Sequence, residues 1–344
     1  MILVECSDRF GTGMLRLGWP AQYLQEAGHD DIKLDWPDTR WGIGAKLRQS
    51  DQTVVGAFVP PGTTTIVIQR ATHKHLVDSI PFFQEQGVRC VVDIDDALDW
   101  VHPSNPAYTG LRPGNPSLHS WLNLRRACQM ADAVTVTTPA LATMYRPDAV
   151  ILPNLMPDHF YGRERIDSTE ICWPASLPSH PNDAEEVTGV LDRVTRDTGA
   201  KVRLIGEGEH AEPLLTRAFG LSTPPILQEF VSMEDWPRFL ASLGVGIAPL
   251  AGTKFNAAKS WLKPLELMTA GVPWVGSDRV EYRRLFEETG VGTVVRKQSD
   301  WYRALKRLVT DDQFRADQSA AGVEAAESYR LRDRAHLWLE VWRG

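Results

Sequence analysis

Short runs of continuous hydrophobic residues alternate with longer amphipathic stretches along the first half of the chain. The hydrophobic runs predict buried strands at Ile2–Cys6, Asp31–Leu34, Thr65–Gln69, Val88–Ile94, Ala133–Val136 and Ala149–Leu152. The amphipathic stretches predict helices over Met14–Ala27, Leu76–Gln86 and Ser120–Met130. Strands that are hydrophobic throughout and alternate with helices indicate a parallel sheet that is covered on both faces.

The same alternation begins again in the second half, after a stretch from Pro153 to about Asp167 that contains Pro, Asn, Asp and Gly and shows no periodicity. Strands are predicted at Glu170–Trp173, Lys201–Ile205, Ile226–Phe230, Val245–Pro249, Val272–Gly276 and Gly292–Val295. Helices are predicted over Ala184–Thr198, Trp236–Leu243, Pro264–Ala270 and from Asp300 to the end. The aperiodic stretch therefore predicts a linker between two similar halves.

We expect an α/β protein with two doubly wound, Rossmann-like domains, and 344 residues suffice for two hydrophobic cores. Residues 1–155 form the first domain, 156–168 the linker and 169–325 the second domain. Residues 326–344 are expected to form a C-terminal helix that packs back on the first domain. Ligands of such sheets bind at the carboxyl ends of the strands, so the two domains should face each other across a central cleft.

Composition and charge narrow the function. The chain is 43% hydrophobic and 24% charged, as ordinary globular proteins are. A formal net charge of -7 provides no general attraction for nucleic acid or anionic membranes. The four cysteines are far apart, the N-terminus is charged too early for a signal peptide, and no uninterrupted apolar run of about 18 residues follows. We expect a cytoplasmic protein without disulfides, and the bias toward Arg, Ala and Val suggests a bacterial or phage source.

The loop Gly11-Thr12-Gly13 follows the first predicted strand and precedes the first predicted helix. Backbone N–H groups of such a loop can face an anion with no Cβ in the way. A dinucleotide-binding fingerprint would need a third glycine at position 16, where the chain has Arg16, so a dehydrogenase is disfavoured. We expect the loop to lie over a phosphate or a sugar, with Arg16 adding charge; a plain tight turn is the alternative.

A second candidate site is the segment Phe255–Glu266. Pro264 suits the first position of a helix, which would place Glu266 in the first turn. Lys259 and Lys263 would provide the cationic charge that a departing diphosphate requires. The alternative is a solvated helix whose charges are four residues apart.

This segment resembles the donor site of the large GT-B family of retaining glycosyltransferases that is often called family 4. It matches the Phe-Asn-x-x-Lys-Ser-x-x-Lys-x-x-Glu pattern of one branch of that family. Many members carry two glutamates eight residues apart; Glu266 matches the second, which in the family contacts the nucleotide ribose. The first falls on Ala258, so Asn256 or Lys259 would hold the transferred sugar instead. Further fragments resemble the same branch, in order along the chain: Gly11–Arg16, Ala131–Pro139, Leu152–Asn154 and Ala175 with His180.

Asp93, Asp95 and Asp96 come at the end of a predicted strand, where burying three like charges without a function would be costly. They could form the Asp-x-Asp metal site of the other glycosyltransferase architecture, GT-A, although the alternation along the chain favours GT-B. In the family, Asp95 and Asp96 stand where a His-Asp pair faces the sugar and the acceptor. Helix caps and solvated turns are the alternative. His102, in the following loop, could reach the acceptor side.

The resemblance implies transfer of a sugar from a nucleotide-diphosphate sugar to an acceptor hydroxyl with retention, without metal or another cofactor. The implied donor-binding residues are Gly11, Gly13, His180, Gly206, Asn256, Lys259, Ser260, Lys263 and Glu266. The implied acceptor-binding residues are Arg16, Asp93, Asp95 and His102. The implied catalytic residues are Asp95, Asp96, Lys259 and Glu266.

The acceptor is left open among a glycan, a lipid-linked glycan, a small molecule and a modified DNA base. Two other functions fit the same architecture. A nucleotide-sugar epimerase would convert the donor without an acceptor, and a non-catalytic protein would only bind the sugar nucleotide.

Overall fold

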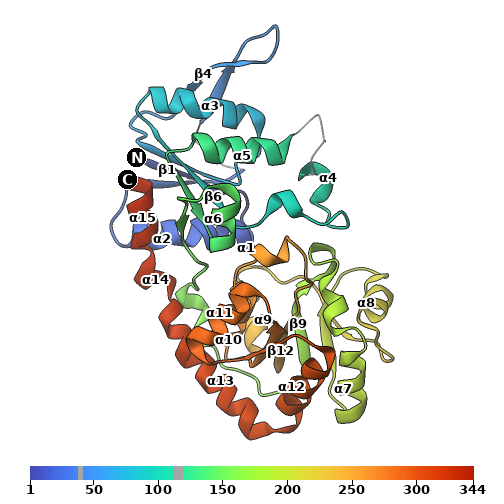
Figure 1. The fold of residues 1–344 in the computed structure, drawn as a ribbon. Helices are drawn as coiled ribbons and strands as arrows, with labels where there is room; N and C mark the ends of the chain where they lie inside the picture. Colours follow the sequence, from blue (N-terminus) through green and yellow to red (C-terminus); the bar gives the residue numbers. More distant parts are fainter. Residues whose placement is uncertain (38–41, 112–118) are drawn as a thin grey trace.

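Two six-stranded parallel sheets, one in each half of the chain, form the framework of the computed structural model, which describes residues 1–37, 42–111 and 119–344 (Figure 1). The first sheet has the strand order β2-β1-β5-β6-β7-β8. Its strands are β1 Ile2–Glu5, β2 Ile32–Asp35, β5 Thr65–Gln69, β6 Arg89–Ile94, β7 Ala133–Val136 and β8 Val150–Ile151. Every residue of β5 is buried, because helices cover both faces of the sheet.

The helices of the first domain divide between the two faces of its sheet. On one face α2 (Trp19–Glu26) packs together with α15 (His336–Arg343). The other face is covered by α3 (Lys74–Glu85) and α5 (Ser120–Met130), and α6 (Pro139–Tyr145) belongs to the same hydrophobic cluster. The topology places the carboxyl ends of β1, β5 and β6 toward the second domain and its cleft.

The second sheet has the order β11-β10-β9-β12-β13-β14. Its strands are β9 Ile171–Ser176, β10 Val202–Ile205, β11 Ile226–Gln228, β12 Val245–Ala248, β13 Trp274–Ser277 and β14 Thr293–Val295. One face carries α7 Val190–Thr198, α8 Ala211–Phe219 and α12 Gln298–Thr310. The other face carries α9 Trp236–Ala241, α10 Leu262–Thr269, α11 Val280–Thr289 and α13 Asp312–Ala326. The predicted α/β architecture of two doubly wound domains is confirmed.

Short helical turns complete the connections. They are α1 Gly11–Gly13, a π-helical turn Met14–Gly18, α4 Tyr108–Leu111 and 3₁₀ turns at Leu98–Trp100, Asp158–Phe160, Leu177–Ser179, Asp183–Val187, Asn256–Ala258 and Glu327–Tyr329.

Several predicted elements need correction. The helix predicted over Ala184–Thr198 is divided: a 3₁₀ turn comes first, and α7 begins only after Gly189, which has a φ of +74°. The helix predicted from Met14 begins earlier, at Gly11. An antiparallel hairpin of β3 (Gly44–Leu47) and β4 (Val54–Phe58), which packs on α3, had not been predicted. Nor had α8 and α11.

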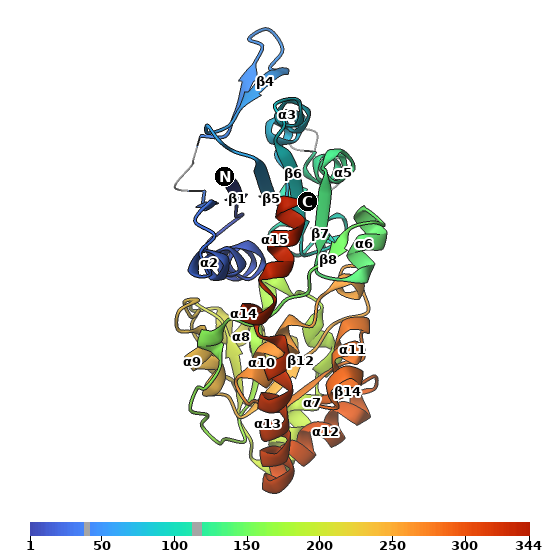
Figure 2. The same cartoon turned by 90° about the vertical axis from the view of Figure 1, so that its left-hand side faces the viewer.

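The chain passes between the domains twice, and the two passages are joined. The first follows β8; the second leads from α13 through α14 (Leu331–Arg334) to α15, as Figure 2 shows. The Met156 N–H donates to the Tyr329 carbonyl over 2.9 Å, and the Leu331 N–H donates to the Met156 carbonyl over 2.9 Å. The two crossing segments thus form one hydrogen-bonded unit at the domain boundary.

Beyond this junction α15 lies against the first domain. The indole N–H of Trp338 donates to the Arg16 carbonyl over 2.8 Å, and the Thr65 hydroxyl donates to the Trp342 carbonyl over 2.9 Å. All four cysteines are buried and free. Within the described residues, no helix combines the length and the apolar character needed to cross a bilayer.

Candidate active site

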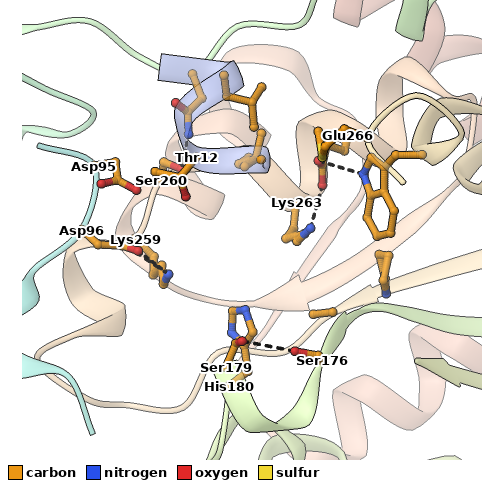
Figure 3. Close-up of a pocket in the computed structure, with 18 of the residues that line it drawn as sticks. Thr12, Asp95, Asp96, Ser176, Ser179, His180, Lys259, Ser260, Lys263 and Glu266 are labelled. Atoms are coloured by element: carbon orange, nitrogen blue, oxygen red, sulfur yellow. Dashed lines mark hydrogen bonds and ion pairs between the residues drawn. The ribbon is translucent and has the colours of Figure 1, made fainter. Parts of the chain in front are cut away.

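A cavity of about 340 Å³ lies between the two domains (Figure 3). The first domain contributes α1 and the segment after β6. The second domain contributes the turn after β9, the segment before α10 and α10 itself. The polar side chains that line the cavity include Thr12, Arg16, Asp95, Asp96, His180, Lys259, Ser260, Lys263 and Glu266. Most of the predicted site residues are therefore brought to one place from both halves of the chain.

Glu266 is held at the cavity wall by two donors. Its side chain is buried; Oε1 accepts from the Trp236 indole N–H over 3.0 Å, and Oε2 accepts from Lys263 Nζ over 2.9 Å. Because α10 begins at Leu262, Pro264 is its third residue and Glu266 lies in the second turn, not the first as predicted. Each carboxylate oxygen can accept a further hydrogen bond, so Glu266 is oriented and still able to bind a hydroxyl.

Lys259 and Ser260 connect the two walls of the cavity. Lys259 Nζ contacts the Asp96 carboxylate over 3.0 Å and lies 4.5 Å from the centre of the Phe255 ring. The Asn154 amide donates to the Ser260 hydroxyl over 2.9 Å. These contacts belong to residues before α10, so the segment that the sequence singled out is also a contact between the domains.

Behind the cavity, buried Asp183 fixes His180 and Asn256. Asp183 Oδ1 accepts from the Ala251 N–H over 2.8 Å and from the Asn256 amide over 2.6 Å, and Oδ2 lies 2.8 Å from His180 Nδ1. The Asn256 amide also donates to the Ala251 carbonyl. Asn256 does not line the cavity; its amide hydrogens hold Asp183, which corrects its predicted role as a direct donor contact.

His180 lines the cavity, and its pKa lies below its usual value. Burial lowers the pKa; the hydrogen bond with Asp183 opposes this, and the positive charges of Lys259 and Lys263 add to it. The imidazole is therefore neutral near pH 7 and can exchange hydrogen bonds with a ligand without adding a charge.

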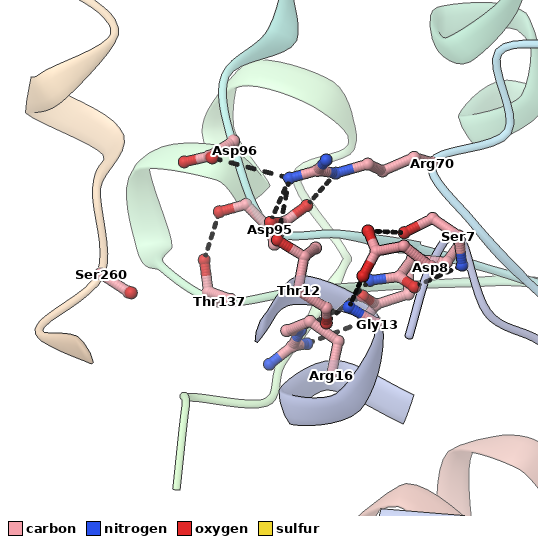
Figure 4. A network of polar contacts seen from close by, with 12 residues as sticks. Ser7, Asp8, Thr12, Gly13, Arg16, Arg70, Asp95, Asp96, Thr137 and Ser260 are labelled. Carbon is pink, nitrogen blue, oxygen red and sulfur yellow. Dashed lines mark hydrogen bonds and ion pairs between the residues drawn. The ribbon is translucent and has the colours of Figure 1, made fainter. Parts of the chain in front are cut away.

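Asp95 is held by Arg70, a residue that the sequence had not indicated (Figure 4). The Arg70 guanidinium donates to both Asp95 oxygens, over 2.6 Å each, and its Nη2 lies 3.7 Å from Asp96. Burial by itself would raise the pKa of Asp95, but the charge and hydrogen bonds of Arg70 outweigh it and the pKa is lowered. The only sequence signal for Arg70 is its position directly after β5, whose carboxyl end faces the cleft.

Arg16 and Asp93 form a buried ion pair beneath the cavity. Arg16 Nη2 lies 2.7 Å from Asp93 Oδ2, and the two side chains are 1% and 0% exposed. Thr135 donates to the same carboxylate, and Arg16 also donates to the Leu152 carbonyl. Asp93 cannot reach an acceptor from this place, and the Arg16 guanidinium is occupied internally. Asp93 does not line the cavity, which corrects its predicted acceptor contact, whereas Arg16 does line it and its acceptor contact stays a prediction.

The predicted glycines have different surroundings. Gly11 lines the cavity, whereas the Gly13 N–H donates to Asp8 over 3.0 Å and a Cβ at Gly13 would lie 1.8 Å from the Asp8 carbonyl oxygen. Gly13 is thus required by close packing of its own loop. Gly206 does not line the cavity; a Cβ there would lie 2.9 Å from Leu215. These two glycines shape the backbone and contact no ligand space.

Two further hollows border the cavity. His102 lines one of about 20 Å³, together with His180 and Asn256. A larger one of about 610 Å³ lies in the first domain at the ends of β1, β2 and β5. Arg70 lines this larger hollow while its partner Asp95 lines the main cavity, so their ion pair forms part of the wall between them.

Among the described residues no group of three His, Cys, Asp or Glu side chains is arranged to hold a metal ion. The Asp-x-Asp interpretation also conflicts with the partners of these carboxylates. Asp93 is paired with Arg16 and Asp95 with Arg70.

Solved structures of low sequence identity share this fold. Sucrose-phosphate synthase from Thermosynechococcus elongatus has a TM-score of 0.64 at 12% identity, over 99% of this chain and 98% of that one. Anabaena HepE, in complex with UDP and glucose, has a TM-score of 0.63 at 13% identity, over 99% of each chain. TarM has a TM-score of 0.61 at 12% identity, over 88% of this chain. This chain spans 64% of the length of TarM.

The fold and the cavity between the two domains define a GT-B protein, as the sequence predicted. Residues 177–311, which lie in the second domain, match the family model of glycosyl transferases group 1. No curated protein sequence matches the chain.

Proposed function

We propose that this protein transfers a sugar from a nucleoside-diphosphate sugar to an acceptor hydroxyl, with retention and without a metal ion. The observation that carries the proposal is the wall formed by Lys259, Lys263 and Glu266, which faces Asp95 and Asp96 across the cavity. One wall has cations and a fixed carboxylate, while the other has carboxylates.

The donor would lie against the second domain. Glu266, oriented by Trp236 and Lys263, would accept hydrogen bonds from the ribose hydroxyls. Lys259 and Lys263 would bind the diphosphate and stabilise its negative charge as the bond to the sugar breaks. The UDP bound to HepE, which shares the fold, supports a nucleoside diphosphate as the ligand class.

The acceptor would approach from the first domain, where the larger hollow adjoins Asp95 through Arg70. An acceptor hydroxyl would donate to Asp95 or Asp96 while its oxygen forms the new bond to the sugar carbon. For retention the new bond must form on the face from which the diphosphate leaves, so both groups share the narrow space between the two walls.

The proposal is tested by isothermal titration with UDP-, GDP-, ADP- and TDP-sugars. One sugar nucleotide should bind, and Glu266→Gln should weaken it about tenfold or more, as expected for lost hydrogen bonds to a charged group. Glu281→Gln is the matched control, since Glu281 is a buried glutamate paired with a cation three residues away and does not line the cavity.

Incubation of the bound donor with acceptor pools then separates the activities. Transfer with retention supports the proposal. Conversion of the donor sugar without an acceptor identifies an epimerase, and unchanged donor indicates binding alone. If no sugar nucleotide binds, the proposal is wrong.

A further inference from the structure

The ion pair between Lys259 and Asp96 joins the two domains across the cavity. The distance is 3.0 Å, and the two side chains are 20% and 17% exposed. Lys259 precedes α10 in the second domain, whereas Asp96 follows β6 in the first (Figure 3). Both line the cavity, so the pair lies in the space that a donor would enter.

Asp95 and Asp96 differ in how firmly the neighbouring cations hold them. Arg70 holds Asp95 with two short hydrogen bonds but lies 3.7 Å from Asp96. Within the described part of the chain, Asp96 is the one carboxylate within ion-pair distance of Lys259. Asp95 is thus firmly held within its own domain, and Asp96 depends mainly on a residue of the other domain.

A diphosphate in this cavity would compete with Asp96. A diphosphate carries more negative charge than a single carboxylate and would attract a lysine more strongly. Among the described residues, Lys259 and Lys263 are the two lysines that line the cavity. Lys263 is already bound to Glu266 on its own helix, which keeps it at the donor wall. Lys259 is bound to the opposite wall, and it must leave Asp96, at least in part, to contact the phosphates at short range.

We propose that Asp96 restrains donor binding: Lys259 exchanges the Asp96 carboxylate for the diphosphate when the donor binds, and Asp96 is thereby released to the acceptor side. This inference rests on the proposed function. It gives Asp96 a role as a positioning residue that acts through Lys259, and it links occupation of the donor site to the availability of an acceptor contact.

The expected effect is modest and has a definite sign. A partly exposed ion pair contributes up to about 1 kcal/mol, so removing Asp96 should strengthen nucleotide binding by about threefold to fivefold. Loss of a side chain that lines a binding cavity usually weakens binding, and a gain is therefore informative.

The experiment is a double-mutant cycle on UDP and UDP-glucose binding by isothermal titration, with wild type, Asp96→Asn, Lys259→Gln and the double variant. If another sugar nucleotide proves to be the donor, that nucleotide and its diphosphate replace the two probes. Glu186→Gln is the matched control, because Glu186 pairs with Arg279 at similar exposure and does not line the cavity. Thermal unfolding of each variant checks that it is folded, and Asp96→Ser replaces Asp96→Asn if that variant is not.

Exchange predicts tighter binding by Asp96→Asn in the wild-type background and no gain in the Lys259→Gln background. An equal gain in both backgrounds would show simple repulsion between Asp96 and the phosphates, and would overturn the exchange. Unchanged or weaker binding by Asp96→Asn would also overturn it, while leaving the proposed function standing. If wild type and variants bind none of the sugar nucleotides, the proposed function fails and the exchange fails with it.

Discussion

Arg16 and Asp93 form an ion pair from which solvent is excluded, although the two residues are 77 positions apart. Arg16 follows β1 and Asp93 is in β6, so the pair joins two parts of the first domain directly below the cavity. The Arg16 carbonyl also accepts from Trp338 of the last helix. Arg16 therefore connects the residues below the cavity with strand β6 of the first sheet and with the C-terminal helix α15.

Breaking this pair should destabilise the protein. Asp93→Asn leaves a buried guanidinium without its counter-charge, and we expect the free energy of unfolding to fall by about 3–5 kcal/mol. Urea denaturation followed by tryptophan fluorescence measures the loss. The double variant Arg16→Met/Asp93→Leu should recover part of it, because no charge is then left unpaired. A loss below about 1 kcal/mol in the single variant would contradict this account.

Trp236→Phe tests whether the indole orients Glu266. The substitution keeps an aromatic wall and removes the hydrogen bond to Oε1. We expect donor affinity to fall about threefold to tenfold, less than for Glu266→Gln, because the indole acts on the donor only through the orientation of Glu266. Trp301→Phe serves as the control, because the buried indole N–H of Trp301 has no hydrogen-bond partner among the residues that the structure describes. Equal affinities of wild type and Trp236→Phe would remove this role.

Arg70→Gln should shift the pH dependence of transfer. Arg70 holds the pKa of Asp95 below its usual value against the opposing effect of burial. Without the guanidinium the pKa of Asp95 rises, and the acidic limb of the kcat/KM profile should move to higher pH. A profile that is lowered uniformly, with its acidic limb unmoved, would indicate that Arg70 acts only on the structure.

His180 should make the protein less stable as the pH falls. Burial and then neighbouring lysines lower its pKa in the folded protein, whereas the unfolded chain titrates near pH 6.5. Below about pH 6.5 the unfolded chain takes up a proton that the folded protein does not, so the free energy of unfolding decreases. His180→Gln should flatten this decrease just below pH 6.5. Parallel curves for His180→Gln and wild type would contradict the prediction.

Metal independence can be tested directly. If Lys259 and Lys263 stabilise the leaving diphosphate, transfer should proceed at an unchanged rate in excess EDTA. The rate is compared with and without added Mg²⁺ or Mn²⁺. Strict dependence on Mn²⁺ would show that the lysines do not suffice and would revive a metal site involving the carboxylates after β6.

The sequence predicted the architecture well because parallel sheets impose a strong pattern. A strand such as Thr65–Gln69 is buried on both faces, and only continuous hydrophobic residues satisfy that environment. The cavity residues of α10 were also predicted, since they lie together along the chain. The hairpin β3–β4 was missed because half-buried strands with Gly and Lys lack this pattern.

The partners of the charged residues could not be predicted. Asp93 and Asp95 are two positions apart, yet one is sealed below the sheet ends by Arg16 and the other faces the cavity with Arg70. Which arginine approaches which carboxylate depends on the register of β1, β5 and β6, and no local pattern encodes it. Similarly, the sequence predicted that Asn256 binds the sugar, whereas in the folded protein its amide donates a hydrogen bond to Asp183.

The hydrogen bonds of Met156 to Tyr329 and Leu331 have a mechanical consequence. A single connecting strand would let one domain swivel and slide against the other in any direction. Two chain segments joined by hydrogen bonds at one position instead share a common pivot. Any movement of the walls that carry Lys259 and Asp96 would then turn about this pivot, and sliding of one domain along the other would strain both connections at once.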